Sequence, residues 1–245
     1  MDDVFSRIAT GHELRSTEAC ELHERGFVVL PGPMSAAKMG RVSSAYDAIL
    51  ASADTGDVHA GSTTTRVTDF VNRCAEFDTL YVFAPLLEAC CRVIGRDFKL
   101  SSMHARTLRP HTPAQELHVD VRRASTDWPL VGFILMIDEF RTDNGATRFV
   151  PGTHHGSNVP EEVMTDRRAN HDGQVLASGP AGSLIIFDGS TWHGHSANTS
   201  DEPRRSVQGA FIPRDGCAAT DFSGRMQSET RARLGPLAQY VLALY

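Results

Sequence analysis

Apolar residues in the first third of the chain recur every three to four positions, a spacing typical of helices that pack by one face. Ser16-Thr17 stand at the start of the first periodic run and Gly26 closes it, as in a capped helix. Gly95 closes a strongly apolar run in the same way. The pattern predicts helices over residues 18–25, 35–52 and 79–94, a short strand over 27–30 and a loop over 53–65.

After Gly95 the pattern changes to short runs rich in β-branched or aromatic residues, separated by Gly, Pro, Asn and Asp. Such runs predict a β-sandwich or a small barrel, and the cupin-like jelly roll, with about eight strands in two packed sheets, is one such fold. The expected strands are Lys99–Leu108, Leu117–Val121, Val131–Ile137, Thr147–Val150, Gln174–Ala177, Leu184–Phe187 and Val207–Ile212.

These elements predict a single domain over residues 1–245, mainly β with flanking helices (α+β), which is within the usual size of one β-rich unit. Its expected parts are a helical region over about 1–96, a β core over about 97–213 and a helical tail over about 224–245. The apolar end from Leu234 to Tyr245 could cap the barrel or form a contact in a homodimer. The sequence leaves both open.

Composition narrows the class of protein. A formal net charge of −6 and a pI near 6.0 argue against a nucleic-acid partner, which usually requires a basic surface. The five cysteines are odd in number and form no C-x-x-C pair, which indicates a reducing compartment. The N-terminus has no signal-peptide pattern, and no apolar run approaches the roughly 18 residues of a membrane span. We therefore expect a cytoplasmic protein.

The candidate chemistry begins with His118 and Asp120. Residues i and i+2 of a strand point to the same face, so this pair would present an imidazole and a carboxylate side by side. An imidazole from a distant strand, His193 or His195, would complete the two-histidine, one-carboxylate set of non-haem Fe(II) oxygenases. Alone the H-x-D motif is weak, because a solvated aspartate at a strand end explains it equally well.

Two further segments give the H-x-D motif a context. The three segments are H-V-D at 118–120, N-G-A-T-R-F-V-P-G-T-H at 144–154 and H-G-H-S-A-N-T-S from 193 with Arg204 beyond it. Taken together, they resemble the phytanoyl-CoA dioxygenase (PhyH) family of Fe(II)- and 2-oxoglutarate-dependent oxygenases, over about residues 27–213. The resemblance implies a double-stranded β-helix, or jelly roll, which agrees with the strand pattern.

The resemblance also implies a ligand set and a co-substrate site. Its metal ligands are His118, Asp120 and His193, since the family pattern places the second histidine before the glycine. Arg204 matches the arginine that binds the distal carboxylate of 2-oxoglutarate, and a guanidinium suits that task by its two parallel hydrogen bonds. Its competitor Arg205 would face the other way in a strand, and parity with Ser206 and Gln208 favours Arg204. Gln115 and Thr147 match further residues that hold 2-oxoglutarate.

Five other residues could lie near such a site. We expect a packing or hydrogen-bonding role for His154 and leave contact with substrate open for Arg66, His104, Arg122 and Arg123, which could equally be surface or structural residues. We expect substrate specificity to come from loops over residues 53–75, 122–130 and 155–173.

The implied activity is that of a dioxygenase that uses Fe(II), 2-oxoglutarate and O2 to oxidise a C–H bond of a small molecule, in keeping with small family members that tailor natural products. The carboxylate at Asp120 favours hydroxylation, desaturation or ring closure over chlorination, since related halogenases lack this ligand. The alternative is a non-redox cupin-type protein, either a metal-dependent isomerase or a small-molecule-binding module, because fold alone does not fix function.

Overall fold

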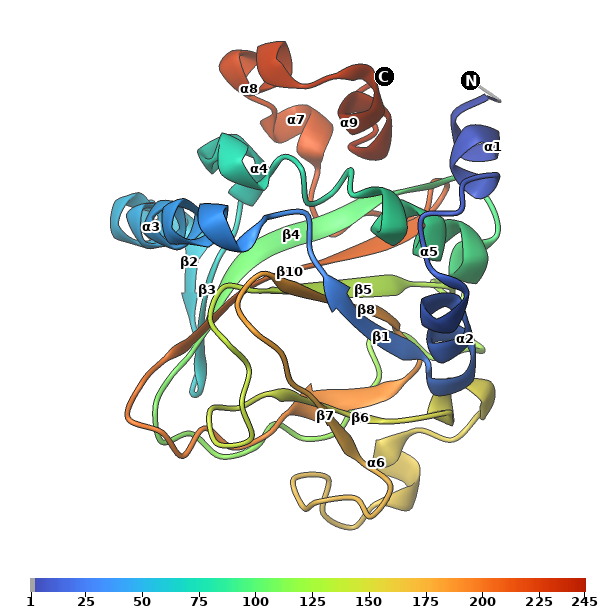
Figure 1. Ribbon diagram of the computed structural model, residues 1–245, viewed down its shortest axis with the longest axis vertical. Helices are drawn as coiled ribbons and strands as arrows, with labels where there is room; N and C mark the ends of the chain where they lie inside the picture. The colour runs from blue at the N-terminus through green and yellow to red at the C-terminus, as the bar shows by residue number, and fades with distance from the viewer. Residues whose placement is uncertain (1–2) are drawn as a thin grey trace.

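Two antiparallel sheets face each other in the computed structural model, which describes residues 3–245 (Figure 1). The larger sheet has seven strands in the order β1 (Phe27–Pro31), β8 (Ser183–Asp188), β5 (Val131–Met136), β10 (Arg204–Pro213), β4 (Phe98–Leu108), β3 (Thr64–Val67) and β2 (Val58–Ala60). The smaller sheet has the order β7 (Val175–Ala177), β6 (Thr147–Val150) and β9 (Trp192–His195). The double-stranded β-helix that the sequence predicted is confirmed.

Most helices cover the outer face of the seven-stranded sheet, on the side away from the smaller sheet (Figure 1). Among the helices of residues 3–245, α6 is the one that lies beyond the smaller sheet (Figure 1). Three short 3-10 turns join the elements, namely η1 (Thr55–Asp57), η2 (Ala75–Phe77) and η3 (Thr153–His155). The helices are α1 (Asp3–Ala9), α2 (Ser16–Arg25), α3 (Ala36–Ser52), α4 (Phe70–Arg73), α5 (Ala84–Ile94), α6 (Pro160–Val163), α7 (Phe222–Arg225), α8 (Ser228–Arg233) and α9 (Pro236–Val241).

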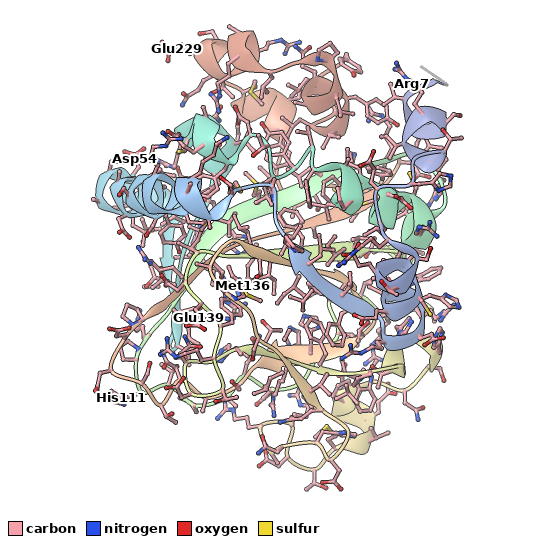
Figure 2. All side chains as sticks on the ribbon, in the orientation of Figure 1. Arg7, Asp54, His111, Met136, Glu139 and Glu229 are labelled. Atoms are coloured by element: carbon pink, nitrogen blue, oxygen red, sulfur yellow. The ribbon has the colours of Figure 1, made fainter. Side chains whose placement is uncertain are left out.

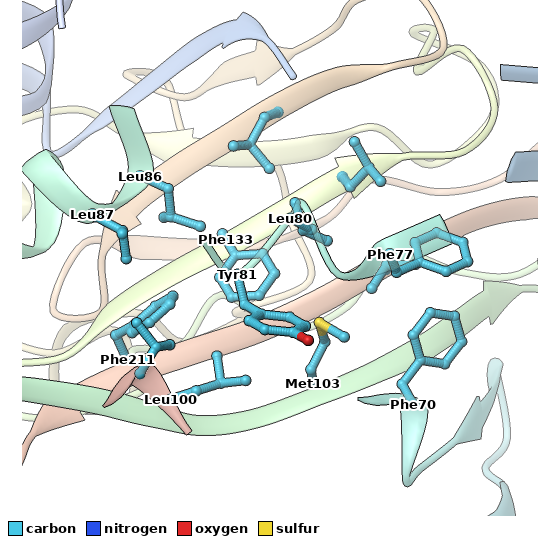
Figure 3. Close-up of a cluster of buried hydrophobic side chains, with 14 of the residues drawn as sticks. Phe70, Phe77, Leu80, Tyr81, Leu86, Leu87, Leu100, Met103, Phe133 and Phe211 are labelled. Carbon is cyan, nitrogen blue, oxygen red and sulfur yellow. The ribbon is translucent and has the colours of Figure 1, made fainter. Parts of the chain in front are cut away.

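The main hydrophobic core lies between this helical layer and the large sheet (Figure 3). Leu86 and Phe211 are fully buried there, and each such side chain contributes about 1.5–3 kcal/mol relative to exposure. A smaller core fills part of the space between the sheets, where Met136 is buried, whereas Asp54 and Glu229 lie at the periphery (Figure 2). The space between the sheets is therefore only partly closed by apolar side chains.

The alternation along β4 and β10 gives this part of the large sheet an apolar outer face and a polar inner face. On β4, Met103 and Ala105 enter the main core, while His104 and Arg106 line a cavity between the sheets. On β10, Val207 belongs to the core, while Arg204 and Gln208 line the cavity. The two-residue period of the strands thus carries charged and polar side chains into the interior of the jelly roll.

Several predicted elements differ from those observed. Residues 78–82 form turns and α5 begins only at Ala84, since Pro85 suits the first turn of a helix. Leu80 is buried in this turn region and not on a helix. The expected loop over 53–65 contains part of a β2–β3 hairpin that extends the sheet. The helix over 16–25 is capped by Arg15 and Glu18, not by Ser16-Thr17.

The strand expected over Leu117–Val121 is not formed. The segment has one isolated bridge, in which His118 pairs with His193, and the chain bends at Asp120 and Val121. Conversely, β9, which carries His193, was not among the expected strands. The sequence of β9 is Trp-His-Gly-His, in which Trp192 is the one apolar residue, so the sequence lacks a strand signal there.

The apolar tail packs within the chain itself. Tyr240, Val241 and Leu244 are buried in the main core, and α9 contacts β4 from the outer face of the sheet. No residue from 234 onward lines the cavity between the sheets, so within residues 3–245 the tail is not a cap over the barrel. None of the described helices is long and apolar enough to cross a membrane.

Candidate active site

Three side chains from distant parts of the chain meet at the inner face of the jelly roll. His118 Nε2 lies 3.9 Å and His193 Nε2 lies 3.6 Å from Asp120 Oδ1, and the three candidate ligand atoms all lie within 4.8 Å of one another. The two imidazole centroids are 4.5 Å apart. Two imidazoles and one carboxylate converging on one point could hold a divalent transition metal.

Backbone pairing explains how the three side chains reach that point. His118 and His193 exchange two backbone hydrogen bonds of 3.0 and 2.9 Å, and Asp120 N donates to Gly189 O at 2.8 Å. The segment that carries His118 and Asp120 is therefore fixed to β9 and to the turn before it. Phe187 and Phe149 pack on the His193 ring, at centroid distances of 4.7 and 5.7 Å.

The tautomers of both histidines suit a metal. Nδ1 of His118 lies 2.9 Å from Glu116 O, and Nδ1 of His193 lies 2.8 Å from Thr191 O. Because a carbonyl can only accept, each Nδ1 carries the proton and each Nε2 keeps its lone pair for the centre. Burial, followed by the neighbouring His193, lowers the pKa of His118 to about 4, so its imidazole is neutral at physiological pH.

Arg204 lies in the same cavity without an acidic partner. It is 1% exposed, its guanidinium carbon stands 4.1 Å from the Phe140 ring centroid, and its Nε and Nη1 are buried with no hydrogen-bond partner in the described chain. Burial, followed by the charge of Arg106, lowers the pKa of Arg204 to about 9. Thr147, 4% exposed, lines the cavity too. Unused guanidinium donors in a closed space call for an anion that can accept from them.

Arg205, the competing arginine, points to the outer side of the sheet. Its guanidinium bonds Asp138 at 2.6 Å and Asp47 at 2.7 Å, and these bonds raise its pKa. Adjacent residues of β10 therefore differ completely: one cation is paired outside and the other is unpaired inside.

All six residues predicted for the site line a single cavity of about 310 Å³. Arg66 and His104, left open by the sequence, line it as well. Arg122 does not, since it pairs with Glu161 and Glu162. The predicted residues that share the cavity are Gln115, His118, Asp120, Thr147, His193 and Arg204.

Two of the remaining candidates have structural roles. His154 is buried, with Nε2 2.9 Å from His23 O at the end of α2, which agrees with the expected hydrogen-bonding role. Arg123 donates to His154 O at 2.6 Å and lies over the Trp128 ring. Both side chains therefore fasten loops outside the cavity.

His195, the rival ligand, lines the cavity beside Thr147, its partner in the β6–β9 register, but is not part of the converging triad. Its Nδ1 lies 2.9 Å from Ser196 O, and burial lowers its pKa to about 3. It is a neutral wall residue of the cavity in this arrangement.

Arg106 is a cavity residue that the sequence reasoning missed. Its Nη1 donates to Gln208 Oε1 at 3.1 Å and its Nη2 donates to Gln115 Oε1 at 3.2 Å. Burial, followed by Arg66, lowers the pKa of Arg106 to about 10. A signal was available: Arg106 shares strand parity with His104, so a face containing one should contain the other.

A second cleft of about 500 Å³ adjoins the cavity and shares Ser101, Asp120, Leu130 and Ala219 with it. Its walls come from residues 121–127 and 212–219. Of the three loops expected to set specificity, 122–130 lines this cleft, 53–75 contributes only Arg66 to the cavity, and 155–173 contributes to neither space. The segment after β10 was not among the expected loops.

A jelly roll that brings two imidazoles and one carboxylate together beside an unpaired buried arginine defines the class of mononuclear non-haem Fe(II) oxygenases. A sequence profile of phytanoyl-CoA dioxygenase (PhyH) matches residues 22–206. The chain belongs to the phytanoyl-CoA dioxygenase family, and it is an Fe(II)- and 2-oxoglutarate-dependent dioxygenase, as predicted.

Individual relatives agree with this assignment. The chain is 26% identical to the Fe(II)/2-oxoglutarate-dependent dioxygenase nvfF of Aspergillus novofumigatus over 243 residues, which cover 89% of this chain and 78% of nvfF. It is 32% identical to the dioxygenase cdmA of Talaromyces verruculosus over 132 residues, or 50% of this chain. That match spans only 42% of cdmA.

Solved structures share the fold. EctD from S. alaskensis with bound Fe superimposes with a TM-score of 0.69 at 16% identity, over 83% of this chain and 78% of EctD. The epimerase SnoN in complex with Fe3+, alpha ketoglutarate and nogalamycin RO gives 0.66 at 19% identity, over 80% of this chain and 82% of SnoN. At these identities the likeness supports the fold alone.

Proposed function

We propose that His118, Asp120 and His193 hold the Fe(II) ion. The observation that carries this proposal is the convergence of their ligand atoms within 4.8 Å, with both Nδ1 atoms committed to backbone carbonyls. The donor set fits the metal, since two imidazole nitrogens and one carboxylate oxygen leave three octahedral positions free. The packing of Phe149 and Phe187 on His193 would keep that ring in place during turnover.

In the same proposal Arg204 binds the distal carboxylate of 2-oxoglutarate, with Thr147 and Gln115 as further polar contacts. The unpartnered Nε and Nη1 of Arg204 support this role, because a carboxylate would satisfy donors that the protein leaves unused. Phe140 under the guanidinium fixes its plane and excludes water. Bound here, Fe(II) and 2-oxoglutarate would supply the electrons that activate O2, the oxidant, for attack on a C–H bond.

The proposed substrate is a small molecule of a natural-product pathway. It would enter through the second cleft, which meets the cavity at Asp120 and Leu130. This cleft mixes hydroxyls, such as Ser125 and Thr126, with the apolar side chains of Val121 and Ile212. Arg96 is paired with Asp215, and Arg122 is paired with glutamates, so most charges on these walls are compensated. The proposed reaction is hydroxylation, desaturation or ring closure at a C–H bond held beside the iron.

Uncoupled turnover tests the reaction class. Purified protein incubated aerobically with Fe(II), ascorbate and 2-oxoglutarate should form succinate, and substrate candidates should accelerate this. A protein that binds metal yet forms no succinate under any condition would favour the non-redox cupin alternative.

The matched pair His193→Ala and His195→Ala tests the ligand assignment. Metal content after loading and desalting should fall by more than tenfold in His193→Ala and stay near one equivalent in His195→Ala. Loss of metal from His195→Ala with retention in His193→Ala would reverse the assignment.

A further inference from the structure

Arg106 lies in a part of the cavity wall that carries positive charge without nearby acidic partners. It lies directly opposite Arg66 in the β3–β4 register, and neither side chain has an ion-pair partner among residues 3–245. Like charges facing each other across two strands are destabilising. Arg106 Nε is also buried with no partner. A sheet that keeps this arrangement must gain something from it in the ligand-bound state.

The contacts of Arg106 show what it controls. An arginine can only donate, so the bond to Gln115 fixes which end of that amide faces Arg106: the oxygen. The Nε2 of Gln115 is thereby turned away from Arg106, and it has no hydrogen-bond partner in the described part of the chain. Arg106 Nη1 donates to Oε1 of Gln208 in the same manner, and Gln208 Nε2 then donates to Ser206 Oγ at 3.2 Å.

Hydrogen bonds fix the backbone of Gln115, so only its side-chain amide group can rotate. Gln115 N donates to His195 O at 3.0 Å, and Gln115 O accepts from Arg148 Nη2 at 2.7 Å. Without Arg106 the terminal amide could rotate and present its oxygen to the cavity. An amide oxygen there would repel a carboxylate that the NH2 group would otherwise bind.

We propose that Arg106 is a positioning residue for 2-oxoglutarate: it orients the Gln115 amide so that its NH2 group donates to the co-substrate. The inference rests on the proposed function of this cavity. The inference adds Arg106 to the proposed site as a residue that acts on the co-substrate indirectly, by orienting Gln115.

The test measures 2-oxoglutarate binding without turnover, by calorimetric titration into Ni(II)-loaded protein. Arg106→Met should weaken binding by about tenfold or more, the amount expected for loss of a hydrogen bond to a charged group. Gln115→Leu should weaken it similarly, and the double variant should be no weaker than either single one, because both remove the same contact. Metal content should be unchanged throughout.

Arg106→Lys separates orientation from charge. Lysine keeps the charge but cannot bond two glutamines with one planar fork, so binding should stay several-fold weaker than in the wild type. Wild-type affinity in Arg106→Lys, or additive losses for positions 106 and 115, would overturn the proposal. The lysine variant decides the matter even if Arg106→Met does not fold.

The outcomes also separate this inference from the proposed function. Should the wild-type protein fail to bind 2-oxoglutarate, the function of the cavity is wrong and the role of Arg106 falls with it. Should the wild type bind it and both Arg106 variants bind it equally well, only the positioning role is wrong.

Discussion

The arginines inside the jelly roll and those on its outer side are held in opposite ways. Outside, Arg205 bonds Asp138 and Asp47, and Arg73 and Arg225 both pair with Asp57. Inside, Arg204 and Arg106 have no acidic partner at hydrogen-bond distance in the described chain. The contrast is sharpest between Arg204 and Arg205, which are neighbours in sequence.

Folding alone explains the outer arginines and does not explain the inner ones. A buried charge without a partner costs several kcal/mol, so a stable fold would pair it, neutralise it or replace it. Among the described residues that line the cavity, Asp120 of the proposed metal centre is the one carboxylate, against the guanidinium groups of Arg66, Arg106 and Arg204. Under the proposed function, this uncompensated positive charge marks the part of the cavity where the anionic co-substrate would bind.

The largest effect should come from removing Arg204, the inner residue of the Arg204–Arg205 pair. In Arg204→Met, 2-oxoglutarate binding to the Ni(II)-loaded protein should weaken by about 100-fold or more, which corresponds to two charge-assisted hydrogen bonds. The unfolding temperature of the ligand-free protein should not fall, because an unpaired buried charge has been removed. Calorimetry and thermal denaturation check the two parts. Unaltered affinity would contradict the role of Arg204.

Thermal stabilisation of the protein by 2-oxoglutarate should depend on Arg204 and not on Arg205. At 100 times its Kd, 2-oxoglutarate should stabilise the Ni(II)-loaded wild type by about 2.7 kcal/mol, which raises the unfolding temperature by several degrees in a domain of this size. Arg204→Met should show almost no rise at the same concentration, whereas Arg205→Met should show the full one. Equal rises in both variants would remove the distinction between the two arginines.

Arg205, the outer residue of the pair, should affect the stability of the fold and not the binding of 2-oxoglutarate. Arg205→Met should lower the free energy of unfolding by roughly 1 kcal/mol, a small amount because solvent screens these partly exposed pairs. Its affinity for 2-oxoglutarate should equal that of the wild type. Urea denaturation and calorimetry measure the two quantities, and a tenfold loss of affinity would show that the outer face also serves the site.

The smallest effect concerns pH. Burial opposes ionisation of Asp57, but hydrogen bonds from Arg225 and Arg73 outweigh it and hold the pKa of its carboxyl below the usual range. A lowered folded-state pKa means that Asp57 stabilises the fold above its unfolded pKa of about 3.9, and that this contribution is lost as pH falls through the lower, folded value. Asp57→Asn should flatten this acid limb of the stability curve. An identical acid limb in the variant would exclude Asp57 as a contributor.

The sequence was most informative where strand periodicity and chemistry coincided. The pattern predicts strands over residues 99–108 and 147–150, which are observed, and parity in β10 favours Arg204 over Arg205 as the inward residue. The H-x-D pair is predicted to face one way, and His118 and Asp120 do meet at one point, although their segment is not a strand.

What the sequence could not give depends on contacts between distant segments. The segment after β10 lines the second cleft only because β10 ends beside the 121–127 loop, which depends on the topology of the fold. The β2–β3 hairpin has few apolar residues and takes its stability from pairing with β4. Strand parity with His104 could have placed Arg106 in the cavity, but its contact with Gln115, which lies outside the sheet, is visible only in the structure.

A crystal structure of the protein with Mn(II) and 2-oxoglutarate, grown without oxygen, tests the central claim most directly. The account predicts one metal ion bound to Nε2 of His118, Nε2 of His193 and the carboxylate of Asp120, with the distal carboxylate of 2-oxoglutarate on the guanidinium of Arg204. A metal ion held by His195 in place of His193, or a co-substrate whose carboxylates leave Arg204 unbonded, would contradict it.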